Sequence, residues 1–124
     1  MRRRRLALAA AAMLAGCATV NMYEGPRRAA AEIALIRGDP RVSAGLPLAA
    51  VIRKLDARAA GLAETRFALE PGRHELLVDC LVAAARTTTR FELTVEVQAG
   101  GRYALVADAA PGNQRCGAVR LVAR

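Results

Sequence analysis

Residues 90–98 read Arg-Phe-Glu-Leu-Thr-Val-Glu-Val-Gln and alternate without a fault between polar and apolar side chains. Successive side chains of a β-strand point to opposite faces, so the apolar residues share one face of an extended chain. These residues are Phe91, Leu93, Val95 and Val97. The pattern predicts a strand that buries one side against a core and exposes the other to solvent.

Six more runs of comparable length flank this strand, separated by Gly, Pro, Asn or Asp. They comprise residues 32–37, 48–56, 65–69, 73–83, 102–108 and 117–123. Short runs with turn residues between them predict an all-β fold, a single small β-sandwich of about seven antiparallel strands. The alanine-rich residues 57–63 and 81–86 also suit a helical turn, which is the competing interpretation at those two places.

A turn in mid-chain gives the clearest indication of a hairpin. Pro71 and Gly72 separate residues 65–69 from residues 73–83. Proline presets one backbone dihedral and glycine accepts positive φ, so the pair predicts a tight turn between two paired strands. Alternation within the second run places Cys80 on its apolar face, and we expect Cys80 to point into the core.

The start of the chain has the features of an export signal. Residues 2–5 are all arginine, and the ten residues 6–15 are apolar. As a helix this apolar stretch would span roughly 15 Å, about half of a bilayer's hydrocarbon core of roughly 30 Å. A charged start followed by a short apolar region is typical of a cleavable signal peptide and not of a stable membrane anchor.

The apolar stretch ends in Leu14, Ala15, Gly16 and Cys17, which resemble the lipobox of bacterial lipoproteins. The resemblance implies that Cys17 receives a diacylglyceryl group and becomes the first residue of the mature protein. Acyl chains anchor a protein firmly, since each buried methylene contributes roughly 0.8 kcal/mol. Ala18 follows where Gram-negative lipoproteins retained in the inner membrane commonly have aspartate. The resemblance therefore implies an anchor in the outer membrane, facing the periplasm; an ordinary secretory signal is the alternative.

Three segments are predicted along the chain: a signal peptide at 1–16, a lipidated tether at 17–31 and a β-sandwich domain at 32–124. The tether is expected because Gly25 and Pro26 interrupt residues that show no periodicity. Removal of the signal peptide would leave 108 of the 124 residues, enough for one domain with a modest core.

Composition limits the classes of partner. The precursor has a formal charge of +8, but four of its 19 basic residues lie in the signal peptide, so 15 basic and 11 acidic residues leave a mature charge of +4. Such a charge suits anionic lipid or other anionic envelope components and is no nucleic-acid signature. The chain lacks Trp and has only two Tyr and two Phe, so a carbohydrate-stacking platform is not predicted either.

Two cysteines remain after the lipid site is assigned. Cys80 and Cys116 would lie in an oxidising compartment, where we expect a disulfide between them. Two free or metal-binding thiols are the alternative. A zinc site from His74, Cys80 and Cys116 would need a further ligand and reduced thiols, so we predict no metal and no cofactor.

Turn sequences supply a second resemblance. Residues 23–26 (Tyr-Glu-Gly-Pro), 69–74 (Leu-Glu-Pro-Gly-Arg-His) and 99–103 (Ala-Gly-Gly-Arg-Tyr) are similar to turns in small envelope lipoproteins of Gram-negative bacteria. The middle motif, from Leu69 to His74, also resembles the hairpin of PEGA-type and transthyretin-like β-sandwich modules. The resemblance implies an envelope-facing sandwich that binds or spaces other components and has no catalytic residues.

No constellation of residues predicts an enzyme. His74, Ser43, Asp79 and Asp108 supply the residue types of a Ser-His-Asp set, but no Gly-x-Ser-x-Gly elbow frames Ser43. Glu92 and Glu96 share one face of the alternating strand, where charges ordinarily keep a strand soluble. We therefore predict no catalytic residues, and we expect His74 to border the turn at Pro71 and Gly72 and to bond to a backbone group.

Two hypotheses for function follow. The first is a membrane-anchored, non-enzymatic structural or protein-interaction module of the cell envelope. The second is a binder of an anionic lipid or small ligand through a basic surface. The second requires arginines to converge in the fold, and the candidates are Arg27, Arg28, Arg53, Arg66 and Arg73.

Overall fold

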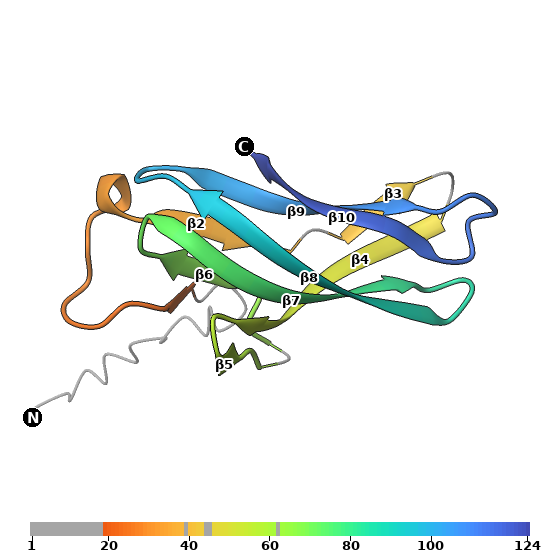
Figure 1. Cartoon of the computed structure of the whole chain (residues 1–124), viewed down its shortest axis with the longest axis horizontal. Coiled ribbons are helices and arrows are strands. Elements are labelled where there is room, and N and C mark those ends of the chain that lie inside the picture. Colours follow the sequence, from red (N-terminus) through yellow and green to blue (C-terminus); the bar gives the residue numbers. More distant parts are fainter. Residues whose placement is uncertain (1–18, 39, 44–45, 62) are drawn as a thin grey trace, which may run out of the picture.

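Two facing β-sheets make up the part of the chain that the structure describes (Figure 1), which confirms the predicted all-β sandwich. The structure is a computed structural model that describes residues 19–38, 40–43, 46–61 and 63–124; the predicted signal peptide and Cys17 lie outside them. Sheet A has the order β1 (Thr19–Asn21), β6 (Arg66–Leu69), β2 (Ala34–Arg37), β9 (Arg102–Ala109) and β10 (Cys116–Ala123). Sheet B has the order β3 (Pro40–Ser43), β4 (Leu46–Leu55), β7 (Gly72–Val82) and β8 (Thr87–Val97), and the short β5 (Arg58–Ala59) pairs with β4.

The seven predicted runs correspond to β2, β4, β6, β7, β8, β9 and β10, and β1, β3 and β5 are additional short strands. The strands are not all antiparallel, because β1 pairs parallel with β6 and β2 pairs parallel with β9. The alanine-rich segments are not helical: β5 lies in the first, and the second ends β7 and turns into β8. Within the described residues the one helix is a 3₁₀ turn, Ala30–Glu32.

The core lies between the sheets and is built from aliphatic side chains around one large ring. Phe67 of β6, Leu55 of β4 and Leu105 of β9 are fully buried in it. The alternating residues that begin at Arg90 lie in β8, and their burial is as predicted. Phe91 is half-buried and Val97 buried, while the polar face of β8 is exposed. Residues on the inner faces of both sheets therefore exclude water from one continuous core.

The predicted hairpin at Pro71 and Gly72 is wrong. The chain crosses there from β6 of sheet A to β7 of sheet B, and β7 pairs with β4 on one side and with β8 on the other. The long hairpin is β7–β8, in register from Gly72 opposite Val97 to Val82 opposite Thr87. Turn chemistry predicts where a chain reverses, but burial decides which strands then pair.

The predicted tether is also partly wrong, because residues 19–31 belong to the folded domain. β1 forms the edge of sheet A beside β6, and the backbone N–H of Met22 continues this pairing to Ala68 at 2.9 Å. Tyr23 is buried over the outer face of sheet A, in contact with Ile33 and Ala68. The sequence lacked a periodic signal here because an edge strand of three residues is too short to show one.

A disulfide between Cys80 and Cys116 joins the two sheets, as the sequence analysis expected. Cys80 lies in β7 of sheet B and Cys116 begins β10 of sheet A, and both are buried. The bridge closes a long loop, with a sequence separation of 36 residues. It therefore restricts the unfolded chain strongly while it fastens one side of the sandwich.

Replacing both cysteines by alanine should lower the free energy of unfolding by about 4 kcal/mol, the chain-entropy value for a loop of this length. Urea denaturation of the wild type with and without reductant measures the same loss, and the double variant, which has no bridge to reduce, is the control. A wild-type urea midpoint that does not move on reduction would contradict the assigned bridge.

Candidate functional site

A buried carboxylate organises the outer face of sheet B. Asp79 of β7 is 5% exposed and lies between Arg53 of β4 and Arg90 of β8. Its Oδ1 accepts a hydrogen bond from Arg90 Nε at 2.9 Å, and its Oδ2 accepts one from Arg53 Nε at 3.0 Å. Arg53 follows the inward-facing Ile52, so alternation along β4 places its side chain on this face, and a β-bulge between Ile52 and Lys54 interrupts the register there. Hydrogen bonds from Arg90, and then from Arg53, hold the Asp79 pKa below its ordinary value against the opposing effect of burial.

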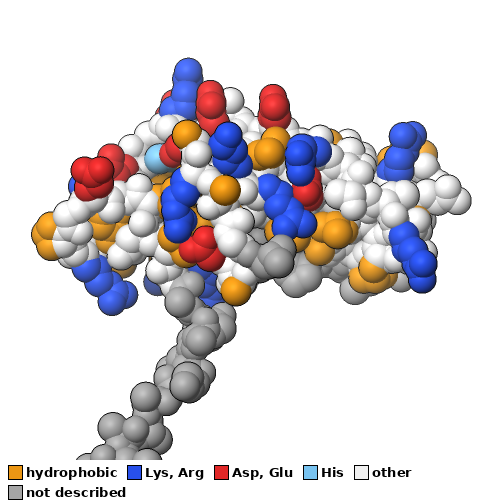
Figure 2. Space-filling view, turned by 90° about the horizontal axis from the view of Figure 1, so that it is seen from below, with side chains coloured by type: hydrophobic (Ala, Val, Ile, Leu, Met, Phe, Trp, Pro, Cys, Tyr) orange, Lys and Arg blue, Asp and Glu red, His pale blue; other side chains and the backbone are white. Residues whose placement is uncertain are grey.

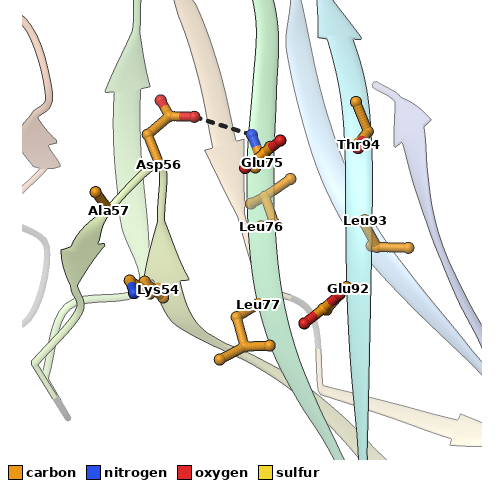
Figure 3. A pocket seen from close by; sticks show the side chains of 9 residues that line it. All are labelled: Lys54, Asp56, Ala57, Glu75, Leu76, Leu77, Glu92, Leu93 and Thr94. Carbon is orange, nitrogen blue, oxygen red and sulfur yellow. Dashed lines mark hydrogen bonds between the residues drawn. The ribbon is translucent and has the colours of Figure 1, made fainter.

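A shallow hollow on this side of the molecule carries charges of both signs (Figure 3). Lys54 and Asp56 approach it from the end of β4, and Glu75 and Glu92 approach it from β7 and β8. The Asp56 carboxylate accepts a hydrogen bond from the backbone N–H of Glu75 at 2.9 Å. Mixed charge and an open shape give this hollow no preference for one class of ligand.

His74 has a structural role in the fold. Its Nδ1 lies against the Asp56 carboxylate and its Nε2 lies 2.6 Å from the backbone oxygen of Glu70. An oxygen atom therefore lies within hydrogen-bond distance of each ring nitrogen, and the ring fastens the β4–β5 turn to β7. Ser43 ends β3, and its side chain lies outside the described part of the chain.

The remaining candidates for chemistry stand apart from one another. Asp108 pairs with Arg120 at 3.2 Å, and Glu96 pairs loosely with Arg73 at 3.9 Å. The thiols of the zinc hypothesis are joined in the disulfide. Among the described residues, no group of three or more His, Cys, Asp or Glu side chains is placed to hold a metal ion.

A groove on the outer face of sheet A is strongly basic. We call it the arginine groove, and Arg37, Arg66, Arg102 and Arg124 line it together with Thr19, Leu35, Ile36 and Tyr103. Its volume is about 400 Å³. Arg37 of β2 and Arg66 of β6 face each other across paired strands, and Arg66 in turn faces Thr19 of β1. Arg102 of β9 faces Leu35, two residues before Arg37 on the same strand.

A second hollow adjoins the arginine groove and shares Thr19 and Leu35 with it. Arg27 and Arg28 line this second hollow. Arg28 is already engaged, because it pairs with Glu70 at 2.9 Å and lies over the ring of Tyr23, 4.8 Å from its centroid. The basic surface of sheet A therefore continues toward the N-terminal segment.

The five arginines proposed from the sequence do not converge. Arg27, Arg28 and Arg66 border the two hollows of sheet A, whereas Arg53 and Arg73 lie on sheet B with carboxylate partners. A view from below shows basic side chains spread over one face with acidic side chains among them (Figure 2). Of the five, Arg66 alone lines the arginine groove.

Sequence reasoning missed Arg37 and Arg102, although both lie at the ends of predicted strands. Gly100 has a φ of 78°, a backbone conformation that favours glycine in the turn before β9. That turn sets the start of β9 at Arg102. The position of Arg102 at the start of a strand predicts an exposed side chain, but only the pairing of β2 with β9 brings Arg102 close to Arg37.

Comparison of the chain with protein-family models, with curated proteins and with solved structures gives no match in any of the three.

Asp79→Asn should lower the free energy of unfolding at neutral pH by about 1–2 kcal/mol, because two arginines lose a charged acceptor in a buried setting. A depressed folded-state pKa stabilises the fold above the ordinary pKa of about 3.9, and this contribution is lost as the pH falls through the folded value. Urea titrations between pH 7 and pH 2 should show a shallower acid loss for the variant than for the wild type. Asp108→Asn, at an exposed ion pair, is the matched control; equal pH profiles for Asp79→Asn and wild type would contradict the prediction.

Proposed function

We propose that this chain is a lipid-anchored, non-enzymatic binding module of the bacterial cell envelope, held close to a membrane surface by acyl chains on Cys17. The observation that carries the proposal is the position of β1. This strand starts at Thr19, two residues after Cys17, and is paired with β6 of sheet A. Two residues span about 7 Å at most, so the lipid would attach almost directly to the folded domain.

The disulfide supports export of the domain. Disulfides persist in oxidising compartments such as the periplasm and are rare in the cytosol. Cys80 and Cys116 are buried and bonded between the sheets, where they contribute to holding the sandwich together. The basic and apolar residues 1–16 supply the matching export signal.

The positions of the polar side chains support a non-enzymatic role. His74 and Asp79 each hold neighbouring strands or turns together. Because Ala18 and not aspartate follows Cys17, we place the anchor in the outer membrane with the sandwich facing the periplasm. An envelope protein or an anionic envelope component is the expected partner, and the resemblance to PEGA-type modules stays a prediction.

A second candidate function is binding of an anionic ligand. The arginine groove favours it, since three strands bring Arg37, Arg66 and Arg102 to one hollow. One molecule could serve both functions, because Thr19 of β1 lies close to the proposed anchor at Cys17 and also lines the arginine groove.

The anchor is tested by producing the full-length chain in Gram-negative cells with labelled palmitate. Cys17→Ser should lose the label and leave the membrane fraction on alkaline washing, because each lost acyl chain removes many buried methylenes. Ala18→Ser is the matched control, since it changes the neighbouring residue, leaves Cys17 and the disulfide in place and should keep the label. Equal labelling of wild type and Cys17→Ser would overturn the proposal.

A further inference from the structure

We infer that the arginine groove binds the phosphate of an anionic lipid headgroup, in the membrane that the acyl chains enter. This inference deepens the proposed function and rests on it for the position of the bilayer.

Three of the four arginines that line the groove differ from five other arginines of the described residues, which are ion-paired. Arg28, Arg53, Arg58, Arg90 and Arg120 each have a carboxylate oxygen within 3.3 Å. Within the described ranges, neither Arg37 nor Arg66 nor Arg102 has an ion-pair partner. The positive charge of these three arginines is thus left for an anion from outside the described fold.

The stability of the fold does not explain why two unpaired arginines of the groove lie on neighbouring strands. Arg37 and Arg66 face each other on paired strands, and like charges directly opposite are destabilising. The repulsion is relieved when an anion lies between the two side chains. Guanidinium groups are planar forks that match phosphate oxygens with two parallel hydrogen bonds, so phosphate is the anion that these side chains suit best.

The apolar wall of the groove favours a lipid over a free ion. Leu35 is half-buried beside Arg102 and belongs to the small apolar cluster with Tyr23, Ile33 and Ala68. A hollow of about 400 Å³ has room for a headgroup with part of its glycerol, which would contact the apolar wall while the phosphate meets the arginines.

The predicted anchor brings the groove to such headgroups. Thr19 lines the groove and lies directly opposite Arg66 on the paired strand. Cys17 is two residues earlier, so the lipid and the arginines lie within a short chain length of each other. Tethering raises the local concentration of membrane phosphates at the groove, and anionic membranes attract basic residues near their surface.

The test uses the mature, acylated protein extracted from membranes and reconstituted in vesicles of phosphatidylcholine, with and without about a third of phosphatidylglycerol. The phosphatidylglycerol carries a photo-crosslinker near its headgroup. Two readouts come from one sample: flotation with the vesicles reports the anchor, and the yield of protein–lipid cross-link reports the groove. Flotation without a cross-link would overturn the groove while leaving the anchor, and a salt-sensitive cross-link without stable flotation would overturn the anchor alone.

Arg66→Gln combined with Arg102→Gln should lower the cross-link yield about thirty-fold, as expected for two arginines lost at an anionic surface. Arg73→Gln combined with Arg115→Gln removes the same charge from other parts of the fold and should keep the wild-type yield. Both positions in the groove variant are exposed, and loss of the Arg66 charge relieves repulsion with Arg37, so its urea midpoint should not fall.

Equal cross-link yields for the two double variants would overturn the inference. The net charge of the protein, and not the arginine groove, would then determine how strongly it attracts anionic lipid. Inorganic phosphate at low millimolar concentration should leave the cross-link intact. Its complete competition would assign the groove to free phosphate and would also overturn the lipid assignment.

Discussion

Burial of two apolar sheet faces against each other is the constraint on which the structure depends. The inner side chains are mostly Leu, Val, Ile and Ala, with Phe67 as the one fully buried aromatic ring. A core of this composition in a chain of 124 residues gives modest stability. The disulfide between β7 and β10 supplements it by joining the sheets covalently. With the inner faces committed to the core, binding is left to the outer faces of the sheets, their edges and the loops.

The outer faces of the two sheets differ in how their arginines are paired. On sheet B, Arg53 and Arg90 share the buried carboxylate of Asp79, so the charges satisfy one another. On sheet A, Arg37 and Arg66 face each other without a carboxylate between them. We regard the first arrangement as structural, because it ties three strands together. The second leaves positive potential at the surface next to β1, and this is the arrangement expected of a binding face.

The sequence predicted the strands well and their partners poorly. Alternation placed β8 and the buried face of β7 correctly, because the side-chain period of a strand can be read directly from residues. The crossing at Pro71 and Gly72 was missed because the same turn residues serve a hairpin and a change of sheet. The arginine groove was missed for a related reason, since Arg37, Arg66 and Arg102 are far apart in sequence and meet only through the pairing of β6, β2 and β9.

The central claim is that the acylated domain lies with β1 and the arginine groove at the bilayer, and the most direct measurement is its depth profile. A fluorescent amino acid at Thr19 should be quenched strongly by headgroup-labelled quencher lipids in vesicles. The same amino acid at Gln114, in the β9–β10 turn at the other end of the molecule from β1 (Figure 1), should be quenched weakly. Equal quenching at both positions, or stronger quenching at Gln114, would contradict the account.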